Sequence, residues 1–134
     1  LTWQILEGKN EIPITLFEAE ESVDAGDIYL QDVIKLQGTE LLSEIKHKQG
    51  VLTQKLVLEF IERYPNITGR KQEGEETYYR KRSIKDSELD VNKSIKEQFN
   101  LLRVVDNERY PAFFYMKGQR YVIKIFKDGT EKND

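Results

Sequence analysis

Apolar and polar residues alternate along two stretches near the start of the chain, and a period of two is typical of β-strands. The first covers residues 12 to 17, where β-branched and aromatic side chains are apolar enough for burial on both faces. The second covers residues 28 to 36. Because an acidic turn with a glycine lies between them, this part of the sequence predicts a strand, a turn and a second strand.

Farther along, apolar residues recur at the helical spacing of three and four. From Thr39 to Tyr64 this spacing predicts one long helix, which Pro65 ends. The only histidine, His47, is expected on the exposed face of that helix. Polar residues 66 to 76 then predict a surface loop, and the spacing from Asn92 to Val105 predicts a second helix.

Two apolar stretches near the end of the chain, residues 113 to 116 and 120 to 126, are separated by a short connection that contains Lys117-Gly118. Such a connection between strand-like stretches is typical of a β-hairpin. The single tryptophan, Trp3, and the single methionine, Met116, are expected to pack in the core. Together the predicted elements make one mixed α/β unit.

Composition and charge narrow the classes of function. A chain of 134 residues suffices for one domain with a core, and 38% hydrophobic with 34% charged residues is normal for a soluble globular protein. The net charge of -3 provides no general attraction to nucleic acid. The sequence has no cysteine, which excludes disulfides and thiolate chemistry. It also contains no metal-ligand spacing and no apolar run that would span a membrane.

The acidic turn is the first candidate site. It reads Asp24-Ala25-Gly26-Asp27 and follows the strand Pro13-Ile14-Thr15-Leu16. Gly26 is free to take a positive φ, which other residues resist. Asp and Gly are also the residues of ordinary surface connections, so the case for function depends on the rest of the chain.

Three segments in the same order give the chain a resemblance to the folate-dependent formyltransferases. The acidic turn is similar to the family's Asp-(Ala/Thr/Ser)-Gly loop, although Pro13 stands where the family has glycine. The stretch from Thr77 to Ser87 is similar to the family's aromatic and basic stretch that ends in Asp-Ser or Asp-Gly. The stretch from Asn100 to Val105 resembles a helix with a buried arginine. It precedes Pro111-Ala112-Phe113, which lacks the glycine of the family's Pro-Gly-Ala-Phe segment.

The resemblance implies an α/β fold class: the C-terminal half of a Rossmann-like formyltransferase domain, with two strands, two main helices and a C-terminal β-hairpin. Residues 1-108 would be the C-terminal part of the catalytic domain, and residues 109-134 the hairpin and tail of the same unit. The stretch that begins at Leu1 corresponds to the helix after the family's Asn-x-His-x-Ser-x-Leu-Pro motif. The catalytic Asn and His are therefore expected upstream, and this chain alone is expected to be an inactive fragment of an enzyme.

The implied reaction is transfer of a formyl group from the co-substrate N10-formyltetrahydrofolate to a primary amine, without a metal. The amine must lose a proton and N10 of the folate must gain one, and a carboxylate beside an imidazole suits this proton transfer. Asp24 is the expected catalytic residue, because it would orient and charge the upstream histidine. The expected cofactor-binding residues, which contribute mainly through the main chain, are Glu20, Glu21, Ser22, Val23 and Gly26.

Aromatic and basic residues form the expected substrate site. Arg82 is expected to meet phosphates through charge-assisted bonds, while the ring of Tyr79 stacks on a base or sugar. Arg80 and Lys81 are typical of solvated charges. Arg103 has apolar neighbours on its helix and is expected to be partly buried and paired, either in a structural salt bridge or with substrate.

The expected acceptor is the amino group of a nucleotide-linked amino-deoxysugar, in a cytoplasmic enzyme with no membrane partner and no nucleic-acid partner unless it is directed to tRNA. Methionyl-tRNA formyltransferases continue into a basic barrel, whereas this chain has a hairpin and an acidic tail. The aromatic run from Tyr110 to Tyr115 offers a homodimer face. Two alternatives stay open: a fragment of a methionyl-tRNA formyltransferase, and a non-catalytic interaction module whose hairpin pairs with a partner's sheet edge.

Overall fold

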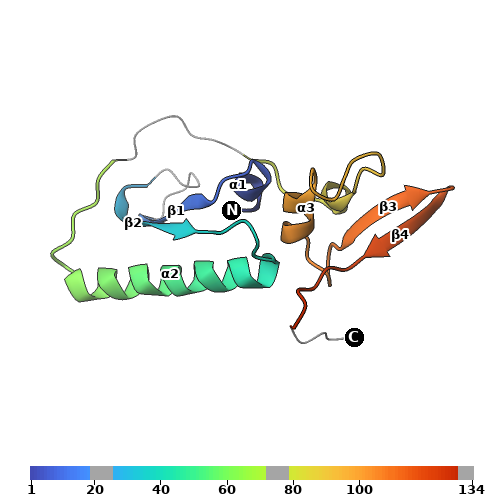
Figure 1. Ribbon diagram of the computed structural model, residues 1–134. Helices are drawn as coiled ribbons and strands as arrows, with labels where there is room; N and C mark the ends of the chain where they lie inside the picture. The colour runs from blue at the N-terminus through green and yellow to red at the C-terminus, as the bar shows by residue number, and fades with distance from the viewer. Residues whose placement is uncertain (19–25, 72–78, 130–134) are drawn as a thin grey trace. The chain divides into compact units, whose positions relative to one another are not determined.

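The computed structural model describes residues 1-18, 26-71 and 79-129 (Figure 1). Its elements are, in order, α1 (Thr2–Leu6), β1 (Glu11–Phe17), β2 (Ile28–Lys35), α2 (Leu42–Arg63), the 3-10 turn η1 (Ile84–Ser87), α3 (Phe99–Val104), β3 (Ala112–Met116) and β4 (Gln119–Ile123). They form two compact units. Unit 1 comprises Leu1–Lys9, Gln37–Glu44 and Tyr79–Asp134, and unit 2 comprises Asn10–Leu36 and Ile45–Tyr78. The expected division after residue 108 concerns functional parts and stays a prediction.

β1 and β2 pair in an antiparallel sheet in unit 2, as the alternating pattern predicts. The register places Ile12 opposite Ile34, and it shifts between Leu16 and Phe17, where the strands approach the acidic turn. In β1 only Ile12 is buried, so the expectation of burial on both faces is wrong within the described part of the chain. A sheet of two strands has too few neighbours to cover both of its faces, which leaves most β1 side chains half-buried or exposed.

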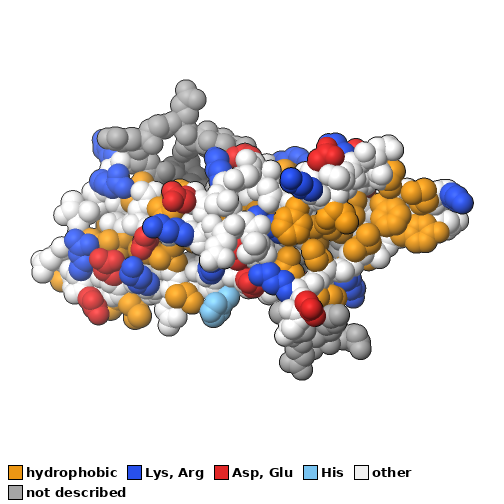
Figure 2. Space-filling model, in the orientation of Figure 1, with side chains coloured by type: hydrophobic (Ala, Val, Ile, Leu, Met, Phe, Trp, Pro, Cys, Tyr) orange, Lys and Arg blue, Asp and Glu red, His pale blue; other side chains and the backbone are white. Residues whose placement is uncertain are grey.

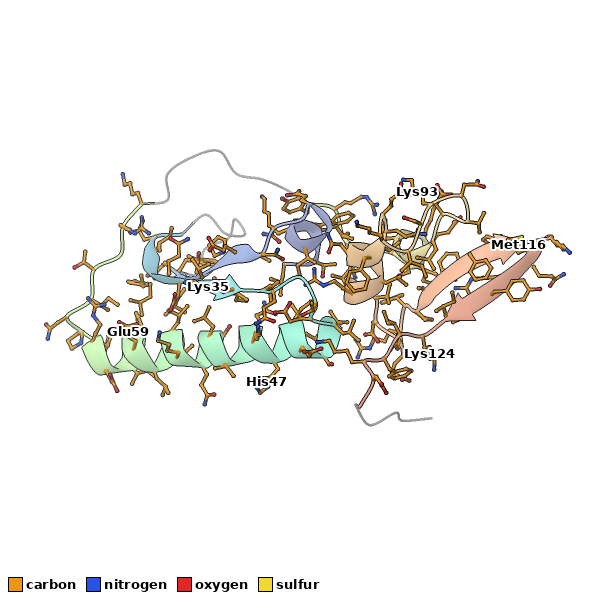
Figure 3. All side chains as sticks on the ribbon, in the orientation of Figure 1. Lys35, His47, Glu59, Lys93, Met116 and Lys124 are labelled. Atoms are coloured by element: carbon orange, nitrogen blue, oxygen red, sulfur yellow. The ribbon has the colours of Figure 1, made fainter. Side chains whose placement is uncertain are left out.

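α2 is the long helix that the apolar spacing predicts, and it runs beside the sheet in unit 2 (Figure 1). It begins at Leu42 rather than at Thr39, because the Glu40 carboxylate accepts the backbone N–H groups of residues 37 to 39 and holds them in a turn. Its His47 is exposed, as expected (Figure 3). None of the helices in the described ranges is both long and apolar enough to cross a membrane.

The second predicted helix is much shorter than its apolar spacing indicates. Instead of residues 92-105, only Phe99–Val104 is helical. Upstream of α3, side chains bond to nearby backbone instead: Asp90 accepts the N–H of Asn92, and Ser94 accepts the N–H of Glu97. Such local bonds offer the backbone an alternative to helix, which explains why the prediction was wrong here.

A buried ion pair joins α3 to the segment before α2 within unit 1. Arg103 is 2% exposed and Glu40 is 3% exposed. The guanidinium of Arg103 donates to the Glu40 carbonyl oxygen at 2.9 Å, to Glu40 Oε1 at 3.3 Å and to Asn100 Oδ1 at 2.8 Å. The expected pairing of Arg103 is therefore confirmed. Because both charges are buried, each depends on the other to offset its lost hydration.

β3 and β4 form the predicted hairpin, closed by Lys117 and Gly118 with φ of 51° and 78°. Two positive φ values in a two-residue connection match the twist of the paired strands. Large apolar side chains gather along the hairpin surface (Figure 2). The expectation that Met116 packs in the core is wrong, since this residue ends β3 beside the turn and is 45% exposed (Figure 3).

Removing the charge of Glu40 should destabilise the fold. The variant Glu40→Gln keeps the size of the side chain but leaves the buried Arg103 charge uncompensated, so we expect a loss of about 3 kcal/mol in the free energy of unfolding, measured by urea denaturation. Glu59→Gln is the matched control, because Glu59 pairs with Arg63 on the exposed surface of α2. It should cost less than about 0.5 kcal/mol. Equal losses in the two variants would contradict a special role for the buried pair.

Candidate functional site

The base of the acidic turn is held closed in unit 2. The backbone N–H of Glu18 donates to the Asp27 carbonyl oxygen at 2.7 Å. Gly26 is buried, and a Cβ on this residue would lie 1.9 Å from the Glu18 carbonyl oxygen. Any larger residue at position 26 would overlap with the opposite backbone. The sequence indicates glycine for its backbone freedom, whereas the structure requires it for this close approach.

Residues 19 to 25, which include the first two residues of the acidic turn, lie outside the described part of the chain. This applies to the expected catalytic Asp24 and to the expected cofactor-binding residues Glu20, Glu21, Ser22 and Val23, whose roles stay predictions. Of that set the structure describes Gly26, which stands two positions after Asp24 in the sequence. Its position is fixed against Glu18, and its expected role in cofactor binding also stays a prediction.

The start of β2 is held from a second side. Ile28 and Arg70 exchange two backbone hydrogen bonds, of 2.7 and 2.9 Å. Residue 70 therefore pairs as a strand residue where a surface loop was predicted, and residues 72 to 76 of that predicted loop lie outside the described part. Near the turn, the Tyr29 hydroxyl donates to the Glu18 carboxylate, and this bond raises the pKa of Tyr29.

A second candidate region lies in unit 1 around Trp3, and we call it the Trp3 cluster: Trp3, Tyr79, Arg80, Arg82 and Asp86. The ring of Tyr79 stacks parallel to that of Trp3, with the centroids 6.2 Å apart. The guanidinium carbons of Arg80 and Arg82 lie 4.9 and 5.5 Å from the Trp3 ring centroid. Trp3 is half-buried, so it serves as a platform for cations and an aromatic ring rather than as the expected core residue.

Within the Trp3 cluster, Arg82 keeps a donor available. Its Nη2 donates to the Asp86 carbonyl oxygen at 3.2 Å. Its Nη1 is buried and has no hydrogen-bond partner among the residues that the structure describes. Burial lowers the pKa of Arg82, although a guanidinium stays charged at any physiological pH. A buried, charged donor without a partner is costly, and an anionic ligand is one way to satisfy it.

The carboxylate of Asp86 organises the rest of the Trp3 cluster. It accepts two bonds from Arg80, one of them at 2.8 Å, and it accepts the N–H of Ser83 at 2.7 Å in a capping box at the start of η1. These bonds hold the pKa of Asp86 well below its usual range. The sequence interpretation gave Asp86 no role, although the spacing Ser83-x-x-Asp86 is itself a cap signal.

The expected substrate residues are only partly brought together. Arg82 and Tyr79 meet at Trp3, and Tyr79 also donates its hydroxyl to Glu7 Oε1 at 2.9 Å, which raises the pKa of Tyr79. The hydrogen bonds of Arg103 go instead to Glu40 and Asn100. Across the described ranges, no three His, Cys, Asp or Glu side chains gather as metal ligands would.

A scan of the sequence against protein-family models finds no match. Among curated proteins, the chain is 26% identical over 135 residues to the methionyl-tRNA formyltransferase of Lactobacillus johnsonii, an alignment that covers 98% of this chain and 43% of the relative. It is 28% identical over 132 residues to that of Thermodesulfovibrio yellowstonii, with 95% and 41% covered. The chain thus spans about two fifths of the length of these relatives.

Solved structures agree with these relatives. The methionyl-tRNA formyltransferase from Clostridium thermocellum superposes with a TM-score of 0.75 at 22% identity, covering 96% of this chain and 57% of that one. A proposed sugar N-formyltransferase from Mycobacterium tuberculosis gives 0.76 at 17% identity, with 98% and 59% covered. The expected resemblance to formyltransferases is confirmed, as is the α/β fold of the C-terminal part of such a domain.

The Asp86 interactions predict a specific dependence of stability on pH. Because the pKa of Asp86 is lower in the folded than in the unfolded chain, its stabilisation is complete above the unfolded value of about 4 and is lost as the pH falls below it. We expect Asp86→Asn to lower the free energy of unfolding by about 1 kcal/mol at pH 7, and this difference from wild type to shrink between about pH 4 and pH 2.

Urea denaturation of both proteins across this pH range measures the difference. Glu108→Gln, which alters an exposed carboxylate, is the control, and its free energy of unfolding at pH 7 should stay within about 0.5 kcal/mol of wild type. A difference between Asp86→Asn and wild type that is independent of pH would show that the Asp86 charge does not act in this way.

Proposed function

We propose that this chain, which is similar in sequence and fold to the formyltransferases, is part of an enzyme that transfers the formyl group of N10-formyltetrahydrofolate to a primary amine. In this reaction the bond from the formyl carbon to N10 breaks and a bond to the amine nitrogen forms, while a proton passes from the amine to N10. The observation that carries the proposal is the acidic turn between β1 and β2, closed at its base by Gly26. Similarity over 95 to 98% of the chain supports it.

Asp24 is the catalytic residue of this proposal. Its carboxylate orients and charges a histidine that lies upstream of Leu1 in the complete enzyme, and that histidine, together with an upstream asparagine, stabilises the oxyanion. The turn from Glu20 to Val23 lines the pterin slot through main-chain groups. Gly26 fits this arrangement, because the Glu18 carbonyl oxygen leaves no room for a side chain at this position.

The acceptor in this proposal is the amino group of a nucleotide-linked amino-deoxysugar, in the cytoplasm. Nη1 of Arg82, which has no partner within the described part of the chain, suits a phosphate oxygen of the nucleotide, and the stacked rings of Tyr79 and Trp3 suit its base or sugar. The net charge of -3 provides no general attraction to the extended phosphate backbone of tRNA. A small anionic ligand, by contrast, needs only one well-placed arginine. A contact of Arg103 with this substrate also stays a prediction.

A second candidate function is formylation of methionyl-tRNA, and the names of the curated relatives favour it. A non-catalytic interaction module is the third alternative. The residues encoded immediately upstream of Leu1 separate this module from both enzymes, because an Asn-x-His motif there supports catalysis and its absence would contradict the catalytic assignment.

Changing Asp24 tests the proposed chemistry. In the complete enzyme we expect Asp24→Asn to lower kcat at least about 100-fold, because the amide can neither charge nor orient the histidine as the carboxylate does. The measurement is the steady-state release of tetrahydrofolate. Asp32→Asn makes the same change on β2, where Asp32 pairs with Lys55, and should leave kcat within about twofold. Turnover near that of wild type in Asp24→Asn would show that the aspartate is misassigned.

We also propose that the hairpin of β3 and β4 forms a homodimer face. An isolated two-stranded hairpin is marginally stable, and a cluster of exposed apolar side chains on it is best covered by a second copy. The exposed residues are Tyr115 at 53%, Met116 at 45%, Tyr121 at 49%, Val122 at 48% and Ile123 at 39%. Both faces of the hairpin contribute. Tyr115 and Tyr121 belong to neighbouring cross-strand pairs, so their side chains lie on opposite faces.

Charging this face should dissociate the dimer. We expect Val122→Asp to raise the dimer Kd at least about 100-fold, because a desolvated charge would lie in an apolar interface. Analytical ultracentrifugation measures this constant. Val51→Asp places the same charge on α2, where Val51 is 55% exposed, and should leave the Kd unchanged. A wild-type protein that is monomeric at high micromolar concentration would contradict the proposal.

A further inference from the structure

The chain beyond α2 returns to the acidic turn. In unit 2 the segment from Ile67 to Arg70 runs beside the start of β2, and its last residue exchanges two backbone hydrogen bonds with Ile28. The side chain of Arg70 also donates to Gln31 Oε1 at 3.2 Å, three residues after Ile28 along β2. Because Ile28 pairs with Phe17 on β1 as well, the strand leaving the turn is held between two backbones at this point.

Gly69 is the residue of this segment that lies against the turn. A Cβ on Gly69 would be 2.8 Å from the Cβ of Asp27 and 3.3 Å from Cε1 of Tyr29. Ordinary contact of a Cβ atom begins at about 3.4 Å, so the two Cβ atoms would have to separate by about 0.6 Å. The Cβ of Asp27 is bonded directly to the backbone, and rotating its side chain cannot relieve this overlap.

Asp27 is the residue that closes the base of the turn. Its carbonyl oxygen accepts the N–H of Glu18, and its preceding neighbour is Gly26, which has no space to move toward Glu18. A shift of Asp27 therefore displaces the base of the turn, and Asp24 stands three positions earlier in the sequence. The absence of a side chain at residue 69 is what lets the 67-70 segment seat Asp27 where it is.

We infer that Gly69 is a positioning residue for the reaction: it lies far from Asp24 in the sequence and acts on it by seating Asp27 at the base of the acidic turn. This inference rests on the proposed function, in which Asp24 is the catalytic residue. Displacing a catalytic group by a fraction of an ångström to 1 Å can cost up to about 100-fold in rate. The effect is therefore expected in kcat rather than in the binding of the amine substrate.

The test compares two glycine substitutions in the complete enzyme. We expect Gly69→Ala to lower kcat by about 10-fold or more, with KM for the amine within about threefold of wild type. Gly50→Ala is the matched control, because a Cβ on Gly50 meets nothing within 4 Å, and its kcat should stay within about twofold. Melting temperatures of both variants separate a loss of fold from a loss of position.

A second pair of variants isolates the Cβ overlap. Asp27→Ala keeps the Cβ and Asp27→Gly removes it, while both remove the carboxylate. Each is combined with Gly69→Ala, and the kcat of the double variant is compared with that of the Asp27 single variant. Asp27→Gly should recover most of the kcat lost in Gly69→Ala, and Asp27→Ala should recover none of it. Equal behaviour of the two double variants would overturn the inference.

Asp24→Asn, measured in the same assay, separates the inference from the function on which it rests. If Asp24→Asn is inactive while Gly69→Ala keeps its kcat, the inference alone is overturned. If Asp24→Asn turns over normally, the proposed catalytic role fails and the positioning role fails with it. If Asp24→Asn is inactive and Gly69→Ala loses kcat at an unchanged melting temperature, both stand.

Discussion

The carbonyl oxygen of Glu18 occupies the place where a side chain at residue 26 would begin, and the base of the acidic turn depends on this constraint. Only glycine allows the backbone after β1 and the backbone before β2 to approach so closely, and the adjacent bond from Glu18 to Asp27 closes the base of the turn. The 67-70 segment adds a second constraint from the other side of β2. These two constraints fix the base of the turn from Gly26 to Ile28, and the proposal that Asp24 transfers a proton rests on this base.

Unit 1 is organised by charge rather than by close approach. Arg103 and Glu40 offset each other's lost hydration in the interior, and the carboxylate of Glu40 also holds the turn that precedes α2. In the Trp3 cluster the Asp86 carboxylate accepts bonds from Arg80, while Arg82 lies over Trp3 and its Nη1 has no partner among the described residues. Of these two arginines, Arg80 donates to the Asp86 carboxylate, whereas Arg82 donates to the Asp86 carbonyl oxygen. This difference is the physical basis for assigning the anionic substrate to Arg82.

Features set by residues close in sequence could be predicted, and features set by distant contacts could not. The pairing of β1 with β2 and the hairpin follow from alternation and turn residues, and α2 follows from its apolar period. The period was misleading in α3, where side-chain bonds to local backbone replace the first turns of the helix. Nothing local indicates that Trp3 meets arginines some 80 positions away, or that Gly69 lies against Asp27.

The central claim is that the complete enzyme transfers a formyl group to the amino group of a small molecule that also carries phosphates. It is tested most directly by supplying the complete protein with N10-formyltetrahydrofolate labelled in the formyl carbon, together with methionyl-tRNA and nucleotide-linked 4-amino- and 3-amino-6-deoxysugars in one mixture. The account predicts that the label appears on the sugar amine. Label confined to methionyl-tRNA would contradict the assigned substrate, and label on neither acceptor would contradict the assigned chemistry.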